Sequence, residues 1–359
     1  MVKLFQSIVA GVLLALQGDI CLAVSPQQPP IEPVVVTQPV SKDSDDPAVW
    51  VNAANPAASL ILGTDKGGKL YVFNLQGETI ADKTVSGLGR PNNVDVEYGL
   101  PFDGRTIDIA VVTDRNRRLL RVFSLPDMRA IDGGGIPSFV GESERRPMGI
   151  ALYKRPADGA IFAIVSRKGG PSGAYLWQYH LRDGGDGRVV MDKVRAFGAF
   201  TGGHEIEAVV VDDELGYVYY ADETAGIRKY HADPDRVDAD RELAFFARQG
   251  FADDHEGLSI YRSGERTGYL LASDQQANRF HIFAREGAAD DPHRHDLIKQ
   301  VTLSTHHSDG SEAIALSLGD DFPCGLFIAM SDDRTFQYYD WRDIAGDDLE
   351  RVGLQCAAQ

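Results

Sequence analysis

Carboxylates gather where apolar segments of this sequence begin or end. The clearest case is the stretch GYVYYADETAGIRKY at 216–230, in which an aromatic run ends in Asp222 and Glu223 and then resumes. Similar acidic groups occur at 43–47, 92–95, 204–207, 253–256 and 308–312. If the fold brings these groups together, unscreened carboxylates repel one another and several must take up protons. A divalent cation removes that conflict, so the pattern predicts metal binding.

The residue types favour calcium as that cation. Calcium takes about six to eight oxygen ligands from carboxylates and carbonyls in flexible geometry. Histidine and cysteine are too sparse here for a typical zinc site, and HEIEA at 204–208 lacks the second histidine of a zinc protease. The alternative for any single aspartate is a structural role in a turn, a cap or a solvated loop. Repetition of the acidic groups is what favours a metal.

Three cations stand at the same place in three successive segments, each directly after the end of an apolar run: Lys66, Arg115 and Lys168. Taken singly, each is an ordinary surface residue. Together they would form a positively charged surface opposite the carboxylates. Metal ions combined with lysine and arginine neutralise phosphate and stabilise its leaving oxygen. The combination therefore predicts phosphate chemistry.

Six units of the chain share a pattern that could bring these residues together. Each unit has an apolar strand, a polar turn and a second strand rich in aromatic residues. The residues aligned at the turn are Asp65, Asp114, Arg167, Asp222, Asp274 and Asp332, with spacings of 49, 53, 55, 52 and 58 residues. A period of roughly 50 residues, all β in character, matches a propeller blade better than a solenoid.

A further apolar segment precedes each of these hairpins and suits an innermost strand. These segments are 47–51, 92–98, 148–153, 207–213, 256–262 and 312–319. We therefore expect an all-β, six-bladed β-propeller with four-stranded antiparallel blades. Residues 33–40 could supply the strand that closes the ring. The turns at one end of a propeller converge on the mouth of its channel, where the carboxylates would meet.

The first residues predict export from the cytoplasm. Lys3 precedes the apolar run 4–16, and CLA at 21–23 has the small-residue spacing of a cleavage site. The alternative is a membrane anchor, but the run is too short to span a bilayer. We expect a signal peptide at 1–23, one propeller domain at 24–359 and a secreted protein, periplasmic or extracellular. Cys324 and Cys356 would remain, and an oxidising compartment permits a disulfide between them without requiring one.

The charge of the chain limits its partners. With 53 acidic and 36 basic residues, the formal net charge is −17. That value argues against nucleic acid or an anionic membrane as a partner, and an anionic substrate would need local cations. A monomer is the default expectation.

The chain resembles the β-propeller phytases, the calcium-dependent alkaline phytases of bacteria. The resemblance runs in order from about residue 40 to 345, through every blade, and is carried by segments such as DSDDPAVWV, RPNNVDVEY, HEGLSIY and SDGSEAIALSLGDDFPCGLFIA. It implies a propeller that binds several calcium ions. It also implies stepwise hydrolysis of myo-inositol hexakisphosphate (phytate, or its calcium complex) in the manner of a 3-phytase.

Carried over position by position, the resemblance assigns roles to individual residues. It implies calcium-binding and catalytic roles for Glu207, Asp254, Glu256 and Asp309, with Glu223 as a further catalytic acid. It implies a structural calcium at Asp46 and the backbone carbonyls of Pro47 and Val94. Lys66, Arg115 and Lys168 would hold phosphate while a calcium-activated water attacks phosphorus in line, without a covalent enzyme intermediate. A neighbouring phosphate of the substrate would occupy a second, affinity site.

Two residues depart from the family pattern. Met148 stands where the family commonly has a tyrosine, so a phenol hydrogen bond would be missing. Ala208 replaces a glycine, which matters only if that position needs a positive φ.

Two other functions are compatible with a propeller of this kind. One is a metal-dependent lactonase or phosphotriesterase, which would need one metal deep in the channel and would make little use of the three cations. The other is a non-enzymatic binding module in which calcium is purely structural.

Overall fold

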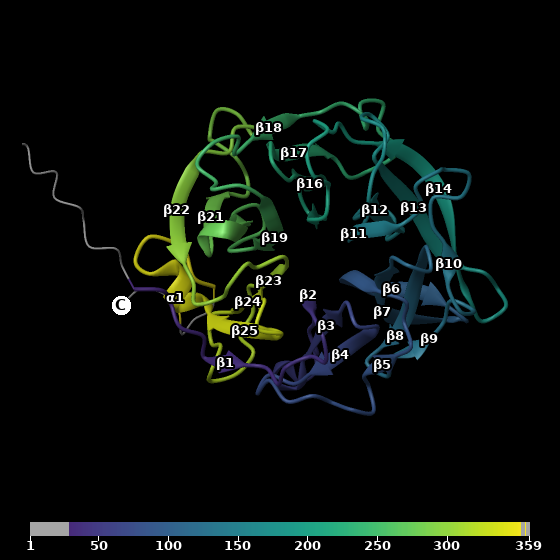
Figure 1. Cartoon of the computed structure of the whole chain (residues 1–359), viewed down its shortest axis with the longest axis horizontal. Coiled ribbons are helices and arrows are strands. Elements are labelled where there is room, and N and C mark those ends of the chain that lie inside the picture. Colours follow the sequence, from purple (N-terminus) through teal and green to yellow (C-terminus); the bar gives the residue numbers. More distant parts are fainter. Residues whose placement is uncertain (1–28, 353–355, 357–359) are drawn as a thin grey trace, which may run out of the picture.

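Six antiparallel sheets stand as blades around a central channel (Figure 1). The structure is a computed structural model, and it describes residues 29–352 and Cys356. The predicted all-β, six-bladed propeller is confirmed. The predicted signal peptide, residues 1–23, lies outside the described residues.

The first three blades follow one another along the chain, and in each the chain runs from the inner strand to the outer strand. Blade 1 consists of β2 (Ser44–Trp50), β3 (Leu60–Asp65), β4 (Lys69–Phe73) and β5 (Val85–Ser86). Blade 2 consists of β6 (Pro91–Phe102), β7 (Arg105–Asp114), β8 (Leu119–Leu125) and β10 (Ile136–Pro137), with β9 (Arg129–Ala130) as a fifth strand beside β8. Blade 3 consists of β11 (Pro147–Lys154), β12 (Ile161–Arg167), β13 (Leu176–Asp183) and β14 (Val189–Phe197).

The last three blades complete the ring. Blade 4 consists of β15 (Val209–Asp212), β16 (Tyr217–Asp222), β17 (Gly226–His231) and β18 (Ala244–Phe246). Blade 5 consists of β19 (His255–Tyr261), β20 (Tyr269–Asp274), β21 (Arg279–Ala284) and β22 (Leu297–Thr302). Blade 6 consists of β23 (Ser311–Ile314), β24 (Leu326–Ser331), β25 (Thr335–Asp340) and β1 (Val35–Val36). The short helices are α1 (Trp341–Ala345) and the 3₁₀ turns η1 (Pro56–Ala58) and η2 (Gln275–Ala277).

Each predicted inner segment overlaps the first strand of a blade, although the segment 312–319 is strand only as far as Ile314, and these first strands surround the channel (Figure 1). The apolar side chains of the described residues form six clusters, one between each pair of neighbouring blades. Strand β16 shows how one strand serves two clusters. Val218 and Tyr220 pack toward blade 3, whereas Tyr219 and Ala221 pack toward blade 5. Successive side chains of a strand point to opposite faces, so a strand buried on both faces reads as a continuous apolar run.

The N-terminal strand closes the ring, as predicted for residues 33–40. Strand β1 pairs antiparallel with β25, so that Val35 lies opposite Tyr338 and Val36 opposite Gln337. The Thr37 amide then donates to the Phe336 carbonyl at 3.0 Å. The outer strand of the last blade is thus supplied by the other end of the chain, which ties the two ends together.

A disulfide joins Cys324 to Cys356, with 5.6 Å between their Cα atoms. The pairing that the sequence permitted is therefore formed, and it fixes the segment after α1 to the loop that enters β24. No helix in the part of the chain described has the length and apolar character needed to cross a bilayer.

Most of the repeated aspartates at the hairpin turns bind backbone amides. Asp65, Asp114, Asp222 and Asp274 accept hydrogen bonds from the amides of Asp43, Gly89, Thr201 and Ala252, at 2.8 to 3.0 Å. Each of these amides belongs to the segment that leads into the inner strand of the same blade. These four aspartates therefore bind the entering segment to the second strand of its own blade. This is the structural role in a turn that was the alternative to metal binding for a single aspartate.

Candidate active site

The predicted site residues come from one end of the ring. Those just before, or at the start of, an inner strand are Glu207, Asp254, Glu256 and Asp309. Those directly after a second strand are Lys66, Arg115, Lys168 and Glu223. Because neighbouring strands of a blade are antiparallel, the start of one and the end of the next lie at the same end of the sheet.

A cavity of about 450 Å³ opens at this end of the ring. It is lined by Lys168, His204, Glu205, Glu207, Glu223, Asp254, Glu256, Gln275 and Asp309. All five predicted catalytic carboxylates therefore meet in one pocket, although they come from three different blades. We call this cavity the acidic pocket.

Burial and mutual repulsion keep protons on several of these carboxylates. Burial, with repulsion from Asp309 and Glu205, raises the pKa of Glu207 to about 7 despite the attraction of Lys66. Burial and the neighbouring Glu207 raise the pKa of Glu223 to about 8. Burial, and then repulsion from Glu207 and Glu223, raises the pKa of Glu256 well above its ordinary value. The pocket is therefore poorly compensated when its carboxylates ionise.

Two buried carboxylate oxygens of residues that line the pocket have no hydrogen-bond partner among the described residues to offset their desolvation. Glu256 is 7% exposed, and its Oε2 has no hydrogen-bond partner among the described residues. Glu205 Oε2 is in the same condition at the pocket wall. Buried polar atoms are normally paired, and carboxylate oxygens are the ligands that a hard divalent cation prefers. The donor set thus fits a calcium site.

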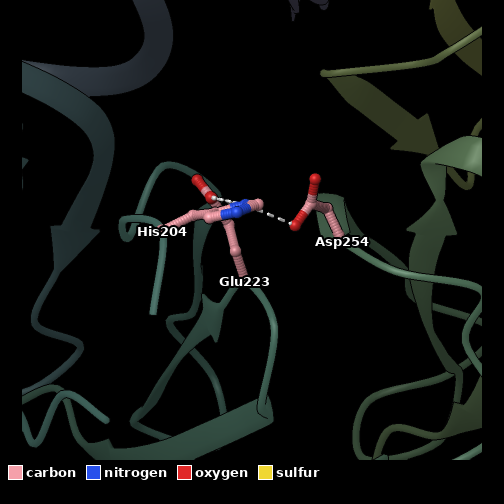
Figure 2. A group of neighbouring side chains, drawn as sticks. All are labelled: His204, Glu223 and Asp254. Carbon is pink, nitrogen blue, oxygen red and sulfur yellow. Dashed lines mark hydrogen bonds and ion pairs between the residues drawn. The ribbon is translucent and has the colours of Figure 1, made fainter. Parts of the chain in front are cut away.

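Two groups of side chains are close enough to share an ion. Oxygen or nitrogen atoms of His204, Glu223 and Asp254 lie within 4.8 Å of one another, and so do oxygens of Glu205, Glu207 and Glu223. Glu223 belongs to both groups. Figure 2 shows the His204 ring lying between Glu223 and Asp254.

Lys66 is held at the edge of the acidic pocket by two carboxylates. Its Nζ lies 2.9 Å from Asp45 Oδ1 and 2.9 Å from Asp309 Oδ2. Burial alone would lower the pKa of Lys66, but attraction by Asp45 and Asp309 outweighs it and raises that pKa. Lys66 therefore stays charged beside the pocket.

The other two predicted cations also lie beside the carboxylates. Arg115 Nη1 donates to Asn92 Oδ1 at 3.2 Å, and Asn92 Nδ2 donates to Glu207 Oε1 at 2.5 Å. Lys168 forms an ion pair with Glu205. The three cations thus occupy three successive blades at the border of the acidic pocket, as their positions in the repeat predicted.

Asp46, Pro47 and Val94 lie together in the central channel, a second cavity of about 580 Å³. Asp46 Oδ2 accepts a hydrogen bond from the Val94 amide at 3.0 Å. Burial raises the pKa of Asp46 well above its ordinary value, which that hydrogen bond only partly offsets. Asp309 lines both cavities, so the channel adjoins the acidic pocket. The grouping is compatible with the predicted structural calcium.

The two departures from the family pattern have different settings. Met148 is fully buried, and its carbonyl accepts a hydrogen bond from Thr113 Oγ1 at 2.7 Å. The next residue, Gly149, packs so closely against blade 4 that a Cβ there would lie 1.6 Å from the Glu207 carbonyl oxygen. Ala208 is not among the described residues with a positive φ, so the glycine is not needed there.

Asp222 does not join Glu223 in the acidic pocket. Its carboxylate accepts from the Thr201 amide and hydroxyl at 3.0 and 2.8 Å and from Arg228 Nε at 2.9 Å. Adjacent side chains at the end of a strand point to opposite sides. The structure therefore places Glu223 in the acidic pocket and Asp222 outside it.

Sequence reasoning left three residues that line the pocket, and two that contact its border, without a role: His204, Glu205 and Gln275, and Asp45 and Asn92. Four of them stand within two or three residues of a predicted ligand, in segments already recognised as acidic or polar. Gln275 directly follows the repeated Asp274, and its Nε2 donates to Asp309 Oδ1 at 2.5 Å. Position relative to the repeat could therefore have found all five.

Comparison with known proteins agrees with the fold and the site. The family model for phytases matches residues 19–339. The 3-phytase of Bacillus subtilis (strain 168) is 29% identical over 328 residues, which cover 86% of this chain and 83% of that protein. The propeller fold, the acidic pocket and these two matches together define a phosphate-ester hydrolase. The chain belongs to the phytase family, and the lactonase and binding-module alternatives gain no support.

Proposed function

We propose that this protein is a calcium-dependent phosphomonoester hydrolase that releases phosphate stepwise from phytate, in the manner of a 3-phytase. The observation that carries the proposal is the acidic pocket with cations at its border. A pocket of buried carboxylates repels phosphate, so it can take that substrate only when cations compensate its charge. Oxygen ligands, and a buried carboxylate oxygen with no partner, favour calcium for that task.

The proposal gives the carboxylates and the cations separate tasks. Glu207, Glu223, Asp254, Glu256 and Asp309 would hold the active-site calcium, and Asp46 with the carbonyls of Pro47 and Val94 would hold a structural one. Bound calcium supplies positive charge that lowers the pKa of water and draws electrons from the phosphate oxygens.

Lys66, Arg115 and Lys168 would orient the phosphate by charge-assisted hydrogen bonds. The ion pairs of Lys66 with Asp45 and Asp309 fix its ammonium before substrate arrives. A second phosphate on the same inositol ring would contact those cations at the border of the pocket that do not hold the first phosphate. The substrate would therefore need adjacent phosphates.

We also propose that the protein is secreted as a monomer. Residues 1–23 have the pattern of a signal peptide. The disulfide between Cys324 and Cys356 is consistent with an oxidising compartment. Mass spectrometry of the exported protein would locate the cleavage site, and light scattering would give the oligomeric state.

Phosphate release from phytate tests the activity. The purified protein is assayed with millimolar calcium and with a chelator, and Glu256→Gln is compared with the wild type. Because Glu256 is buried in the pocket, Glu256→Gln should lose at least about 100-fold in rate. Glu97→Gln is the matched control, since Glu97 is also a buried carboxylate but lines the channel outside the acidic pocket. Release that persists in chelator, or an equal loss in both variants, would contradict the proposal.

A further inference from the structure

A loop of blade 5 is held against blade 4 by one buried side chain. Residues 285–296 join β21 to β22, and blades 4 and 5 are neighbours in the ring (Figure 1). We call these residues the blade 5 loop. They are exposed or half-buried apart from Arg285, Gly287 and His295. His295, which is 5% exposed, therefore anchors the second half of the loop.

Lys229 of β17 contacts the blade 5 loop at two points. It is fully buried, and its Nζ donates to the Pro292 carbonyl at 2.6 Å and to His295 Nε2 at 3.2 Å. The other ring nitrogen of His295, Nδ1, lies 2.8 Å from the Ala284 carbonyl oxygen. A carbonyl oxygen only accepts, so Nδ1 carries the proton and Nε2 is the acceptor for the Lys229 amine. The contact therefore requires a neutral imidazole.

Aromatic rings enclose this pair of side chains, Lys229 and His295. Lys229 Nζ lies 3.9 Å from the ring centroid of Tyr217 and 5.3 Å from that of Tyr219. His295 stacks on Phe246 with 4.6 Å between the ring centroids, and it meets Tyr219 edge-on at 5.6 Å. The rings leave little access for water that could solvate an added charge on the imidazole.

The carboxylates near the pair are engaged elsewhere. Asp212 of β15 forms an ion pair with Arg285 at 2.6 Å, and Asp291 Oδ1 accepts from the His293 amide at 2.9 Å. Neither carboxylate forms an ion pair with the pair among the described residues. The other titratable groups that face it are His293 and the two tyrosines, and burial raises the pKa of both tyrosines, which keeps them neutral. No anion is therefore placed to compensate a second positive charge.

Acid acts on this contact through His295. Burial, and then the neighbouring Lys229, lowers the pKa of His295 to about 4. Burial also lowers the pKa of Lys229 to about 7, although Asp212 and Asp291 oppose that change. Protonation of His295 turns Nε2 into a donor that faces the donor Nζ across 3.2 Å. Acid therefore removes a hydrogen bond and adds a buried charge at the same place.

We propose that the contact of Lys229 with His295 and Pro292 is a pH-sensitive switch, which holds the blade 5 loop on blade 4 at neutral pH and releases it in acid. The released loop binds more protons than the docked loop, so the contribution of His295 is complete above about pH 6.5 and is lost as the pH falls toward 4. The docking equilibrium should change about 100-fold between pH 7 and pH 4. The inference is independent of the proposed function, because none of these residues lines the acidic pocket.

Nuclear magnetic resonance of the full chain with ¹⁵N-labelled histidine reports the protonation state directly. In the wild type, His295 should be the neutral Nδ1–H tautomer at pH 7 and should titrate near pH 4. Lys229→Met removes the neighbouring amine, so the pKa of His295 should rise toward about 6.5. The wild-type titration needs no variant, so it decides the matter even if Lys229→Met does not fold. A wild-type His295 that titrates near pH 6.5, or that is the Nε2–H tautomer, would overturn the inference.

Hydrogen–deuterium exchange followed by mass spectrometry measures release of the loop. Protection of the amides in 285–296, relative to an unstructured peptide at the same pH, should fall about 100-fold from pH 7 to pH 4. His295→Gln cannot take up a proton, so its protection should fall less than about threefold. His180→Gln is the matched control, since His180 also stacks on a phenylalanine, Phe162, at 5.0 Å but lies on β13 of blade 3. It should keep the wild-type fall.

Strand β3 of blade 1 separates local release from acid unfolding of the whole chain. Its amides should keep their protection at pH 4 while those of the blade 5 loop lose theirs. An equal fall in β3, or an equal fall in the loop of the wild type and of His295→Gln, would overturn the inference. Unchanged protection of the wild-type loop at pH 4 would overturn it as well.

Discussion

The calcium-free protein should lose stability as the pH rises, because its buried pocket carboxylates must give up protons. Glu207 shows the size of the effect. Its pKa rises from 4.5 to about 7 in the folded protein, chiefly through burial. The stability that this bound proton supplies is fully present below about pH 4.5 and is lost as the pH rises through about 7. At about 1.4 kcal/mol per pKa unit, the shift amounts to about 3 kcal/mol, of which about 2 to 3 kcal/mol is lost between pH 5 and pH 8.

Urea unfolding followed by circular dichroism measures this loss. The free energy of unfolding is determined at both pH values, with a chelator and with millimolar calcium. Calcium should remove most of the fall, because the cation replaces the protons. Glu207→Gln cannot titrate, so its fall in chelator should be smaller than that of the wild type by about 2 kcal/mol. Glu223, whose pKa rises to about 8, acts in the same direction.

Glu265→Gln serves as the control, since Glu265 lies on an exposed loop and should leave the pH dependence intact. An equal fall in the wild type and in Glu207→Gln would refute the reasoning. At pH 5 protons already neutralise the pocket carboxylates, so calcium should stabilise the protein less there than at pH 8. Equal stabilisation by calcium at both pH values would also refute the reasoning.

Three further changes test other parts of the structure. Gly149→Ala places a Cβ 1.6 Å from the Glu207 carbonyl oxygen, so blade 3 must shift. The substitution should lower the free energy of unfolding by about 2 to 4 kcal/mol, measured by urea unfolding. It should also weaken calcium binding, measured by calorimetry. Lys66→Met removes a fixed cation and should lower kcat/KM for phytate about 100-fold, with the fold unchanged by circular dichroism. Opening the Cys324–Cys356 disulfide, which spans 32 residues, should lower the free energy of unfolding by about 3 to 4 kcal/mol, measured with and without reductant. Stability unaffected by the reductant would contradict this expectation, because it would show that the disulfide does not stabilise the fold.

The sequence by itself determined the propeller fold and the position of each blade along the chain. Strands buried on both faces read as continuous apolar runs. Their repetition at roughly 50 residues indicates a propeller, and the six repeats indicate six blades. The position of Lys66 directly after one apolar run, and of Glu256 at the start of another, placed both at the same end of the ring. These are local properties of strands and turns, so they can be recognised in the sequence alone.

Only the tertiary structure decided which carboxylates face the pocket and which face their own blade. Asp222 and Glu223 are neighbours in sequence, yet Asp222 binds Thr201 and Arg228 while Glu223 meets Asp254 from another blade. The pairing of His204 with two carboxylates likewise depends on how two blades approach each other. Side-chain direction at a strand end and the distance between blades are set by packing over the whole ring. No single segment contains that information. Residue type alone therefore could not distinguish an aspartate that binds backbone amides of its own blade from a carboxylate that faces the pocket.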